Sequence, residues 1–189
     1  MRKYKGEGAM SYTVEQLPDL EAIKRLKSRY CRATDLGDEA LLRQIFTEDV
    51  TVEYRGGAYT AMANGVDEMI DFLMNAHHSE MITMHQAHLP DITFTGPDSA
   101  EGIWYCEDFH IALDRKEITM GCLIYTDQYV RRNGEWLIAR TEYSRVWEAF
   151  EPLRPGIQIT AHQLARTGRQ PGERKNIDHL LHWKDRAAA

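Results

Sequence analysis

The sequence predicts an α+β protein in which a curved antiparallel sheet and the helices before it enclose a cone-shaped pocket. Two observations lead to this prediction. Helical patterns of apolar residues dominate the first third of the chain, and long strand-like segments follow one another from about residue 81. Helices followed by successive strands are typical of α+β folds and not of doubly wound parallel sheets. A long helix across the open side of such a sheet would make a cone, whose mouth is a natural site for a small molecule.

Three helices are expected before the long strands. Asp19 is a suitable N-cap for the first, and apolar residues three and four positions apart continue to about Asp35. A second, short helix is expected over about 41–46, and the pattern over about 66–76 is again helical. The long first helix is therefore the expected cover of the sheet.

The strand patterns begin with a small hairpin of residues 50–54 and 59–63. Four long strands are expected after the third helix, at about 81–95, 101–113, 118–132 and 135–148. Asn133 and Gly134 form the strongest short hairpin signal and join the last two strands. Pro90 indicates that the first long strand is an edge strand or contains a bulge.

The chain divides into three expected segments. Residues 1–13 are polar and aperiodic and are expected to be a flexible lead-in, whereas residues 14–150 form the cone domain. Residues 151–189 are a proline-rich extension, in which the amphipathic stretch from Ile177 to Trp183 predicts a short helix. A chain of 189 residues fits one domain with a sizeable core.

Composition excludes several partners. With 29 acidic and 23 basic residues the formal net charge is −6, so the basic surface that phosphate backbones need is not expected, nor is a nucleic-acid partner. No apolar run approaches the roughly 18 residues of a membrane span, and the first residues lack the apolar core of a signal peptide. Cys31, Cys106 and Cys122 are odd in number and form no CxxC motif, which favours a reducing compartment. We therefore expect a cytoplasmic protein without a membrane contact.

Asp35 and His85 are the first candidate pair for a functional site. Asp35 is expected at the C-terminal end of the first helix, which is already the negative end of the helix dipole, so its carboxylate needs a cationic or proton-donating partner. His85 lies in a mostly apolar strand, where its ring needs a hydrogen-bond acceptor. Taken alone, Asp35 is better explained as a solvated residue that opens a turn, and His85 as a satisfied core histidine. Because each side chain would meet the need of the other, we expect a hydrogen bond between them beneath the pocket.

A metal site and a cofactor are not expected. His85 and His88 are three residues apart, and such residues point to opposite faces of a regular strand, so they cannot hold one ion. His77 and His78 are expected on the surface at a helix end. The chain has no GxGxxG or P-loop motif and no GxSxG nucleophile motif. General acid–base chemistry by His, Asp and Tyr remains.

Asp108 is a third candidate. On the strand that carries it, four residues alternate onto one face: Trp104, Cys106, Asp108 and His110. If this face lines the pocket, its apolar wall would raise the pKa of Asp108 and let it act as an acid near neutrality. If it is the solvent face of the sheet, Asp108 is an ordinary surface carboxylate, and the sequence favours neither reading.

Three segments carry a resemblance to a known family. They are AIKRLKSRYCRATDLGD at 22–38, LLRQIFTEDVTVEY at 41–54 and YTDQYVRRNGEWLIAR at 125–140. Over about residues 14–150 the chain resembles the SnoaL-like branch of the nuclear transport factor 2-like superfamily. The resemblance implies a cone-shaped α+β barrel and is weaker evidence for activity, because the superfamily includes enzymes, binding domains and assembly modules.

The polar residues sharpen the resemblance. A first-helix Asp followed by a His after the third helix is similar to the pattern of scytalone dehydratase, bile-acid 7α-dehydratase and lindane dehydrochlorinase, where the pair is a catalytic dyad. By the same resemblance, Tyr30 matches the helix tyrosine of the dehydratases and Asp108 the second carboxylate of the bile-acid enzyme. His110 falls near the second histidine of scytalone dehydratase, and Arg145 near a family arginine on the last strand.

Together these features imply a cofactor-independent lyase of the dehydratase type. It would eliminate water or another small leaving group from a hydrophobic cyclic substrate of the steroid, bile-acid or polyketide kind. Asp35 would fix the tautomer of His85, which would abstract a proton. Tyr30 and Asp108 would protonate or hydrogen-bond the departing group. The residues expected to bind the substrate are Tyr54, Met84, His88, Trp104, His110, Met120, Leu123 and Arg145.

Other functions stay open. The same cone could hold an isomerase or cyclase, a dehydrohalogenase, or a small-molecule-binding module without catalysis. The resemblance also implies assembly through the outer face of the sheet. That face is expected to carry Tyr105, Phe109, Ile111, Tyr125 and Tyr129, more aromatic surface than a solvated face should show. We therefore expect a homo-oligomer, either a dimer or a trimer.

Overall fold

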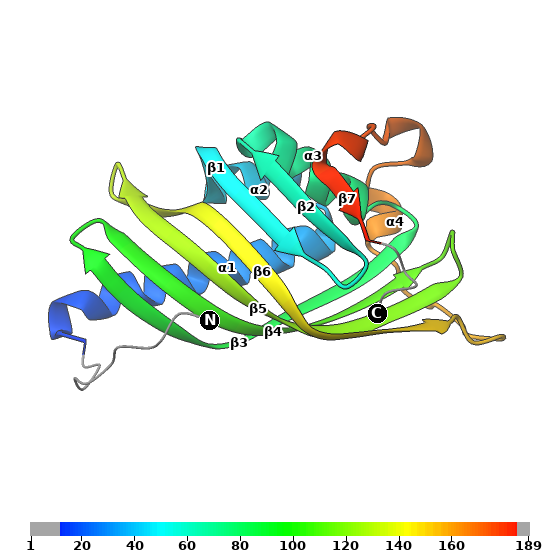
Figure 1. Ribbon diagram of the computed structural model, residues 1–189, viewed down its shortest axis with the longest axis horizontal. Coiled ribbons are helices and arrows are strands. Elements are labelled where there is room, and N and C mark those ends of the chain that lie inside the picture. Colours follow the sequence, from blue (N-terminus) through cyan, green and yellow to red (C-terminus); the bar gives the residue numbers. More distant parts are fainter. Residues whose placement is uncertain (1–11, 185–189) are drawn as a thin grey trace.

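The computed structural model describes residues 12–184, which form an α+β fold around one curved, seven-stranded sheet (Figure 1). The strand order is β3-β4-β5-β6-β1-β2-β7. The strands are β1 (Phe46–Arg55), β2 (Tyr59–Asn64), β3 (Met81–Gly96), β4 (Ser99–Ala112), β5 (Glu117–Arg132), β6 (Glu135–Pro152) and β7 (Leu181–Trp183). The helices are α1 (Leu17–Leu36), α2 (Glu39–Ile45), α3 (Val66–Ala76) and α4 (Leu164–Thr167), and the 3-10 turns are Val14–Gln16, Pro171–Glu173 and Asp178–Leu180. The expected fold class is confirmed.

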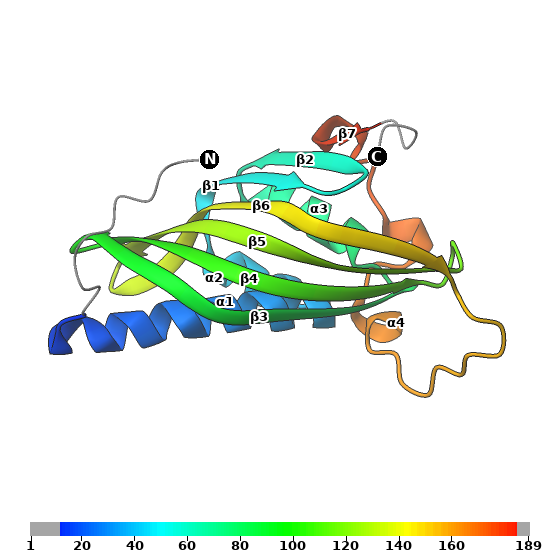
Figure 2. The same cartoon turned by 60° about the horizontal axis from the view of Figure 1, so that its bottom comes forward.

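Helix α1 runs along the concave side of the long strands, and the main core lies between them (Figure 2). The helix begins earlier than expected, at Leu17, because Thr13 and Gln16 form a capping box just before it. The prediction that Asp19 is the N-cap is therefore wrong. Asp19 lies in the first turn, where its Oδ1 accepts hydrogen bonds from Arg131 Nη1 at 2.8 Å and from Trp136 Nε1 at 2.9 Å. These bonds tie α1 to the β5–β6 hairpin.

One strand pairing differs from the expected antiparallel sheet, since β1 and β6 are parallel. No hairpin joins these two strands, because the chain passes from β1 through β2, α3 and the β3–β5 meander before it reaches β6. A crossover of that length permits parallel pairing, which a short turn does not. The other five pairings are antiparallel, and four of them join strands that the sequence predicted.

The turn and edge signals of the sequence are confirmed. β3 is an edge strand, and its register with β4 shifts between Ala87 and Pro90, so that proline lies at both an edge and a bulge. Asn133 and Gly134 have φ angles of 54° and 82°, as a two-residue type I′ hairpin requires.

The extension after β6 returns to the sheet. The predicted helix from Ile177 to Trp183 is wrong, because the chain forms the turn Asp178–Leu180 and then β7, which pairs with β2. The free edge of β2 offers unpaired backbone groups that a short strand can satisfy, whereas an isolated helical turn leaves most of its own unpaired. The first eleven residues of the expected lead-in, 1–11, and the last five of the extension, 185–189, lie outside the described residues. No helix in residues 12–184 is long and apolar enough to cross a membrane.

Two residues expected on the outer face of the sheet are instead in the core. Tyr125 and Tyr129 are 2% and 1% exposed. The β4–β5 register explains this difference, because Tyr125 pairs with the inward residue Trp104 and not with Tyr105. Tyr105 and Phe109 do lie on the outer face, and Ile111 shares it but is buried.

Candidate active site

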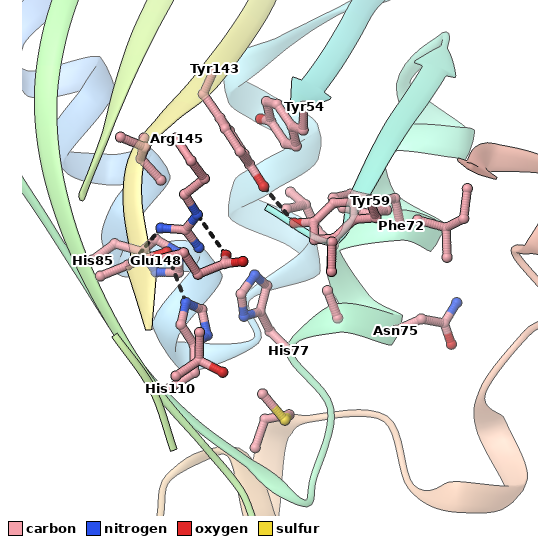
Figure 3. Close-up of a pocket in the computed structure, with 18 of the residues that line it drawn as sticks. Tyr54, Tyr59, Phe72, Asn75, His77, His85, His110, Tyr143, Arg145 and Glu148 are labelled. Atoms are coloured by element: carbon pink, nitrogen blue, oxygen red, sulfur yellow. Dashed lines mark hydrogen bonds and ion pairs between the residues drawn. The ribbon is translucent and has the colours of Figure 1, made fainter. Parts of the chain in front are cut away.

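A cavity of about 480 Å³ opens between the concave side of the sheet, α3 and the C-terminal extension. Aromatic and apolar side chains line part of it, among them Tyr30, Tyr54, Phe72, Leu123 and Tyr125. A group of ionisable side chains also lines it: His77, His85, Asp108, His110, Arg145 and Glu148. Figure 3 labels all of these except Asp108. An apolar pocket with a few convergent polar groups is the usual form of a small-molecule site.

Asp35 and His85 are in contact at the inner side of this cavity. The last turn of α1 places Asp35 against β3, where its carboxylate accepts hydrogen bonds from His85 Nδ1 at 2.7 Å, His85 N at 2.9 Å and Thr83 Oγ1 at 3.0 Å. Burial alone would raise the pKa of Asp35, but the hydrogen bonds and the charge of His85 outweigh it and lower the pKa. These donors explain how a carboxylate persists at the negative end of a helix.

The ionised Asp35 defines the tautomer of His85. A carboxylate is an acceptor only, so the proton of a neutral His85 ring lies on Nδ1. Nε2 then carries the free lone pair. The His85 side chain is 6% exposed and lines the cavity, so this lone pair is available to a ligand in a place that excludes most water.

Asp108 belongs to a second charged group. Its carboxylate contacts His110 Nε2 at 3.1 Å and Arg145 Nη1 at 2.5 Å, and Arg145 Nε contacts Glu148 at 2.9 Å. Burial would raise the pKa of Asp108, but the hydrogen bonds from His110 and Arg145 hold it well below its usual range. The expectation of a raised pKa is therefore wrong, because the sequence did not reveal that β6 brings Arg145 to this carboxylate. Asp108 is ionised and cannot serve as the acid.

Three imidazole rings meet at the centre of the site. The ring centroids of His77, His85 and His110 lie 5.2 to 5.7 Å apart. Burial is the main cause that lowers the pKa values of His77 and His110, so both rings are neutral near pH 7. His77 and His78 were expected on the surface and are buried instead, because the extension packs over the end of α3 and the Ser79 amide donates to the Arg169 carbonyl at 3.1 Å.

Tyrosine hydroxyls complete the polar lining. Tyr30 OH lies 3.1 Å from Tyr54 OH and 3.4 Å from Tyr125 OH. A second pair, Tyr59 and Tyr143, is joined at 2.5 Å (Figure 3). Burial is the main cause that raises the pKa of each of these five phenols, so all of them remain protonated donors.

Most of the expected site residues do face the cavity. Those that line it are Tyr30, Tyr54, His85, Asp108, His110, Leu123 and Arg145, with Asp35 in contact behind His85. Four residues that were expected to bind the substrate do not line it: Met84, His88, Trp104 and Met120.

Strand alternation explains three of these four corrections. Met84 is adjacent to the inward His85 and is therefore on the outer face, 42% exposed. Met120 is three residues from the inward Leu123 and pairs with the outward Phe109. His88 is three residues from His85, and its half-exposed ring lies 3.6 Å from Glu107. Trp104 does face inward, but its Nε1 donates to Tyr129 OH at 2.7 Å, within the core.

The sequence analysis missed several lining residues. They are Tyr59 on β2, His77 at the end of α3, and Tyr143 and Glu148 on β6, and no local pattern connects the three elements. Glu148 carried a weak signal, because it follows Arg145 by three residues and thus offered an ion pair. Ile177, Leu181 and Trp183 of the extension also line the cavity, and the pairing of β7 with β2 brings Leu181 and Trp183 there.

Within residues 12–184, one combination of side chains could hold a metal ion. Ligand atoms of His85, Asp108 and His110 lie within 4.8 Å of one another. The Arg145 guanidinium already neutralises the Asp108 carboxylate at 2.5 Å, where a metal ion would have to bind. The residues present therefore fit an arginine–carboxylate pair better than a metal site, and the expectation of no metal stays a prediction.

The fold and the cavity define a class of cone-shaped α+β proteins with a small-molecule pocket. A family model described as SnoaL-like domain matches residues 15–142, and the chain belongs to this family, within the nuclear transport factor 2-like superfamily.

Solved structures agree with this assignment at the level of the fold. A hexachlorocyclohexane dehydrochlorinase, LinA type 3, from Novosphingobium barchaimii is 21% identical with a TM-score of 0.65, over 78% of this chain and 98% of that chain. A scytalone dehydratase-like protein from Novosphingobium aromaticivorans is 20% identical with a TM-score of 0.65, over 78% of this chain and 93% of that one. A Mycobacterium tuberculosis protein of unknown function is 19% identical with a TM-score of 0.59, over 85% and 90%.

Proposed function

We propose that this protein is a cofactor-independent lyase that eliminates water or another small leaving group from a hydrophobic cyclic substrate of the steroid, bile-acid or polyketide kind. The observation that carries the proposal is the contact between Asp35 and His85, 2.7 Å long, at the wall of a largely apolar cavity. A histidine ring held against a carboxylate through Nδ1 is the arrangement of a general base. The cavity volume of about 480 Å³ suits a small polycyclic molecule.

Proton abstraction is the first step. His85 Nε2 takes an acidic proton, ideally from a carbon beside a carbonyl group, and the imidazolium that forms is stabilised by Asp35. Asp35 also accepts a hydrogen bond from the backbone amide of His85, so its carboxylate holds both the ring and the strand that carries it.

The departing group needs a different partner from the one the sequence suggested. Asp108 is ionised, so its role is to position His110 and Arg145 beside the cavity. The imidazolium of His85 returns its proton to a departing hydroxide, which leaves as water. Tyr30, held between Tyr54 and Tyr125, hydrogen-bonds the substrate at the cavity floor.

A dehydrohalogenase is the second candidate. A halide leaves without protonation, and the ionised Asp108 is consistent with a site that lacks a carboxylic acid. The similarity to hexachlorocyclohexane dehydrochlorinases points the same way.

Product analysis tests the proposal. The protein is incubated with a panel of cyclic β-hydroxy ketones, with their β-chloro analogues and with non-hydroxylated ketones in deuterated water, and products are identified by mass. Loss of water supports the dehydratase, and loss of hydrogen chloride alone supports the dehalogenase. If the β-hydroxy and β-chloro ketones lose neither water nor hydrogen chloride and their mass rises only by deuterium uptake, the result supports an isomerase and overturns the lyase. Ligand binding with neither elimination nor uptake assigns a binding module.

We also propose that the protein is a cytoplasmic homo-oligomer. The outer face of the sheet exposes a group of large apolar side chains: Met84, Tyr105, Ile124 and Trp147. A patch of this kind on a solvated sheet marks an interaction surface, and the occupant proposed here is a second copy of the chain. The three cysteines are buried and unpaired, which suits the reducing cytoplasm.

A further inference from the structure

Tyr59 and Tyr143 form a hydroxyl pair that the mechanism above does not use. Their oxygens are 2.5 Å apart, and both residues line the cavity. Figure 3 shows the two phenols meeting on one side of the site, with His85 and His110 on the other. The Tyr143 ring stacks on Tyr54 with centroids 4.4 Å apart, and the Tyr59 ring packs at 5.9 Å from Trp183, so neighbours hold both phenols in place.

One hydroxyl proton of this pair takes no part in the hydrogen bond between the two tyrosines. Two hydroxyl groups carry two protons, and the bond between them uses one. Among the described residues, neither hydroxyl has another hydrogen-bond partner. Because both residues line the cavity, the second proton is available there to an acceptor, which the oxygen of a bound ligand can supply.

Burial raises the pKa of both phenols, so the pair acts as a donor and not as a base near neutral pH. It therefore fits a ligand oxygen that accepts a hydrogen bond.

The nearby charges indicate which kind of oxygen is accepted. Arg145 is the cation beside the pair, but it is already bound to Asp108 and Glu148. One guanidinium between two carboxylates leaves a net negative charge, and a carboxylate ligand would be repelled. A neutral carbonyl oxygen meets no such penalty.

We infer that Tyr59 and Tyr143 bind the carbonyl oxygen of a neutral, cyclic ketone substrate, an inference that rests on the proposed function. When His85 takes the proton from the carbon beside the carbonyl, the C–H electron pair forms a C=C bond. The carbonyl π pair moves to the oxygen, which the hydroxyl pair hydrogen-bonds. As the carbonyl re-forms, the bond to the leaving hydroxyl breaks, and the hydroxide takes the proton from His85 and leaves as water.

Ligand binding tests this inference without turnover. The probe is 1-tetralone, a bicyclic ketone without a leaving group, and its carbonyl stretch is followed by infrared spectroscopy while affinity is measured by calorimetry. We expect the band to move to lower wavenumber on binding to the wild-type protein and to His85→Ala. Tyr59→Phe and Tyr143→Phe should each weaken binding by about 5- to 10-fold, as loss of one hydrogen bond predicts, and the double variant should abolish the band shift.

Two controls make the result decisive. Thr119→Val removes a hydroxyl from the lining of the same cavity and should leave the band shift in place. In addition, 1-naphthoate, a carboxylate of similar shape, should bind at least tenfold more weakly than the ketone. A band shift that persists in the double variant, no binding of the ketone, or tighter binding of the carboxylate overturns the inference. Should the double variant not fold, as judged by circular dichroism, the two single variants decide it through their affinities. Because His85→Ala retains the band shift, failure of the proposed base leaves this readout unchanged.

Discussion

At the scale of single residues, the site depends on what surrounds each carboxylate. Asp35 and Asp108 are both ionised, but Asp35 holds a histidine that faces the cavity, whereas Asp108 is shared between His110 and Arg145. An aspartate therefore orients the proposed general base in one position and forms a fixed ion pair in the other. Burial alone would raise the pKa of both carboxyl groups, and the specific donors decide the direction of each pKa shift.

Substitutions in the Asp35–His85 pair should separate their two roles. We expect His85→Ala to abolish turnover, because it removes the base, and Asp35→Asn to reduce turnover by about 10³- to 10⁴-fold, because an amide favours the wrong tautomer. Steady-state kinetics with the substrate found by product analysis measures both. His88→Gln, on an exposed ring of the same strand, should change turnover less than twofold. Turnover of His85→Ala within tenfold of wild type would contradict the assignment of the base.

At the scale of elements, a buried ion pair joins α1 to β5 beneath the tyrosines. Lys27 Nζ lies 2.8 Å from Asp127 Oδ2 and 3.3 Å from the centre of the Tyr125 ring, and neither charged side chain is exposed. Tyr129 OH donates to the same Asp127 oxygen at 2.8 Å. This network sets how α1 lies on the sheet, and α1 in turn carries Tyr30 and Asp35 to the cavity.

Removing one partner of this ion pair should lower the free energy of unfolding far more than replacing both partners with apolar residues. Lys27→Met leaves the Asp127 carboxylate buried without its cation, and we expect the free energy of unfolding to fall by about 3–5 kcal/mol. The double variant Lys27→Met, Asp127→Leu should recover most of this loss, because no charge remains buried. Urea unfolding of the two single variants and the double variant completes the cycle. A loss below about 1 kcal/mol for Lys27→Met would contradict the picture of a fully desolvated pair.

At the scale of the whole molecule, buried histidines link stability to pH. The pKa of His77 and that of His110 are lower in the folded protein than the ordinary value of 6.5, mainly through burial. Such a group contributes stability that is complete above the unfolded pKa and is lost as the pH falls below it, because only the unfolded chain takes up the proton. Asp35 and Asp108, whose pKa values are lowered, keep their contributions down to about pH 4.

We therefore expect the free energy of unfolding to decrease between pH 7 and pH 5. His77→Gln should flatten this dependence, since it removes the titrating ring with the strongly lowered pKa. Urea unfolding at four pH values across the range measures the slope. The exposed His88→Gln should keep the wild-type slope, and equal slopes in all three proteins would show that the buried ring does not titrate as proposed.

Self-association also belongs to the whole molecule. Trp147 is half exposed on the outer face of β6, within the apolar group proposed to meet a second copy. We expect light scattering on a size-exclusion column to give a multiple of 21.9 kDa for the wild-type protein and a lower mass for Trp147→Lys. Leu89→Lys, at an apolar residue on the edge strand β3 that is more exposed than Trp147, is the control and should leave the mass unchanged. A wild-type mass near 22 kDa would contradict the proposed oligomer.

The sequence by itself determined the order of the elements as far as β6, the hairpin at Asn133–Gly134 and the edge position of Pro90. These depend on local backbone preferences and on hydrophobic period. It also identified Asp35 and His85 as partners, since each is locally costly alone and the contact between them satisfies both. Strand alternation would have placed Met84 and Met120 on the face opposite His85 and Leu123, had the parity of the strand been applied strictly.

Only the tertiary structure decided the rest. The ionisation of Asp108 depends on Arg145, 37 residues away on another strand, and no local pattern reports that distance. The parallel pairing of β1 with β6 and the return of the extension as β7 depend on which sheet edges are free, a property of the assembled sheet. The Tyr59–Tyr143 pair likewise joins residues 84 positions apart. Periodicity shows which face of a strand is apolar, but packing decides which side chains from other elements contact that face. The chemistry of this cavity depends on those contacts.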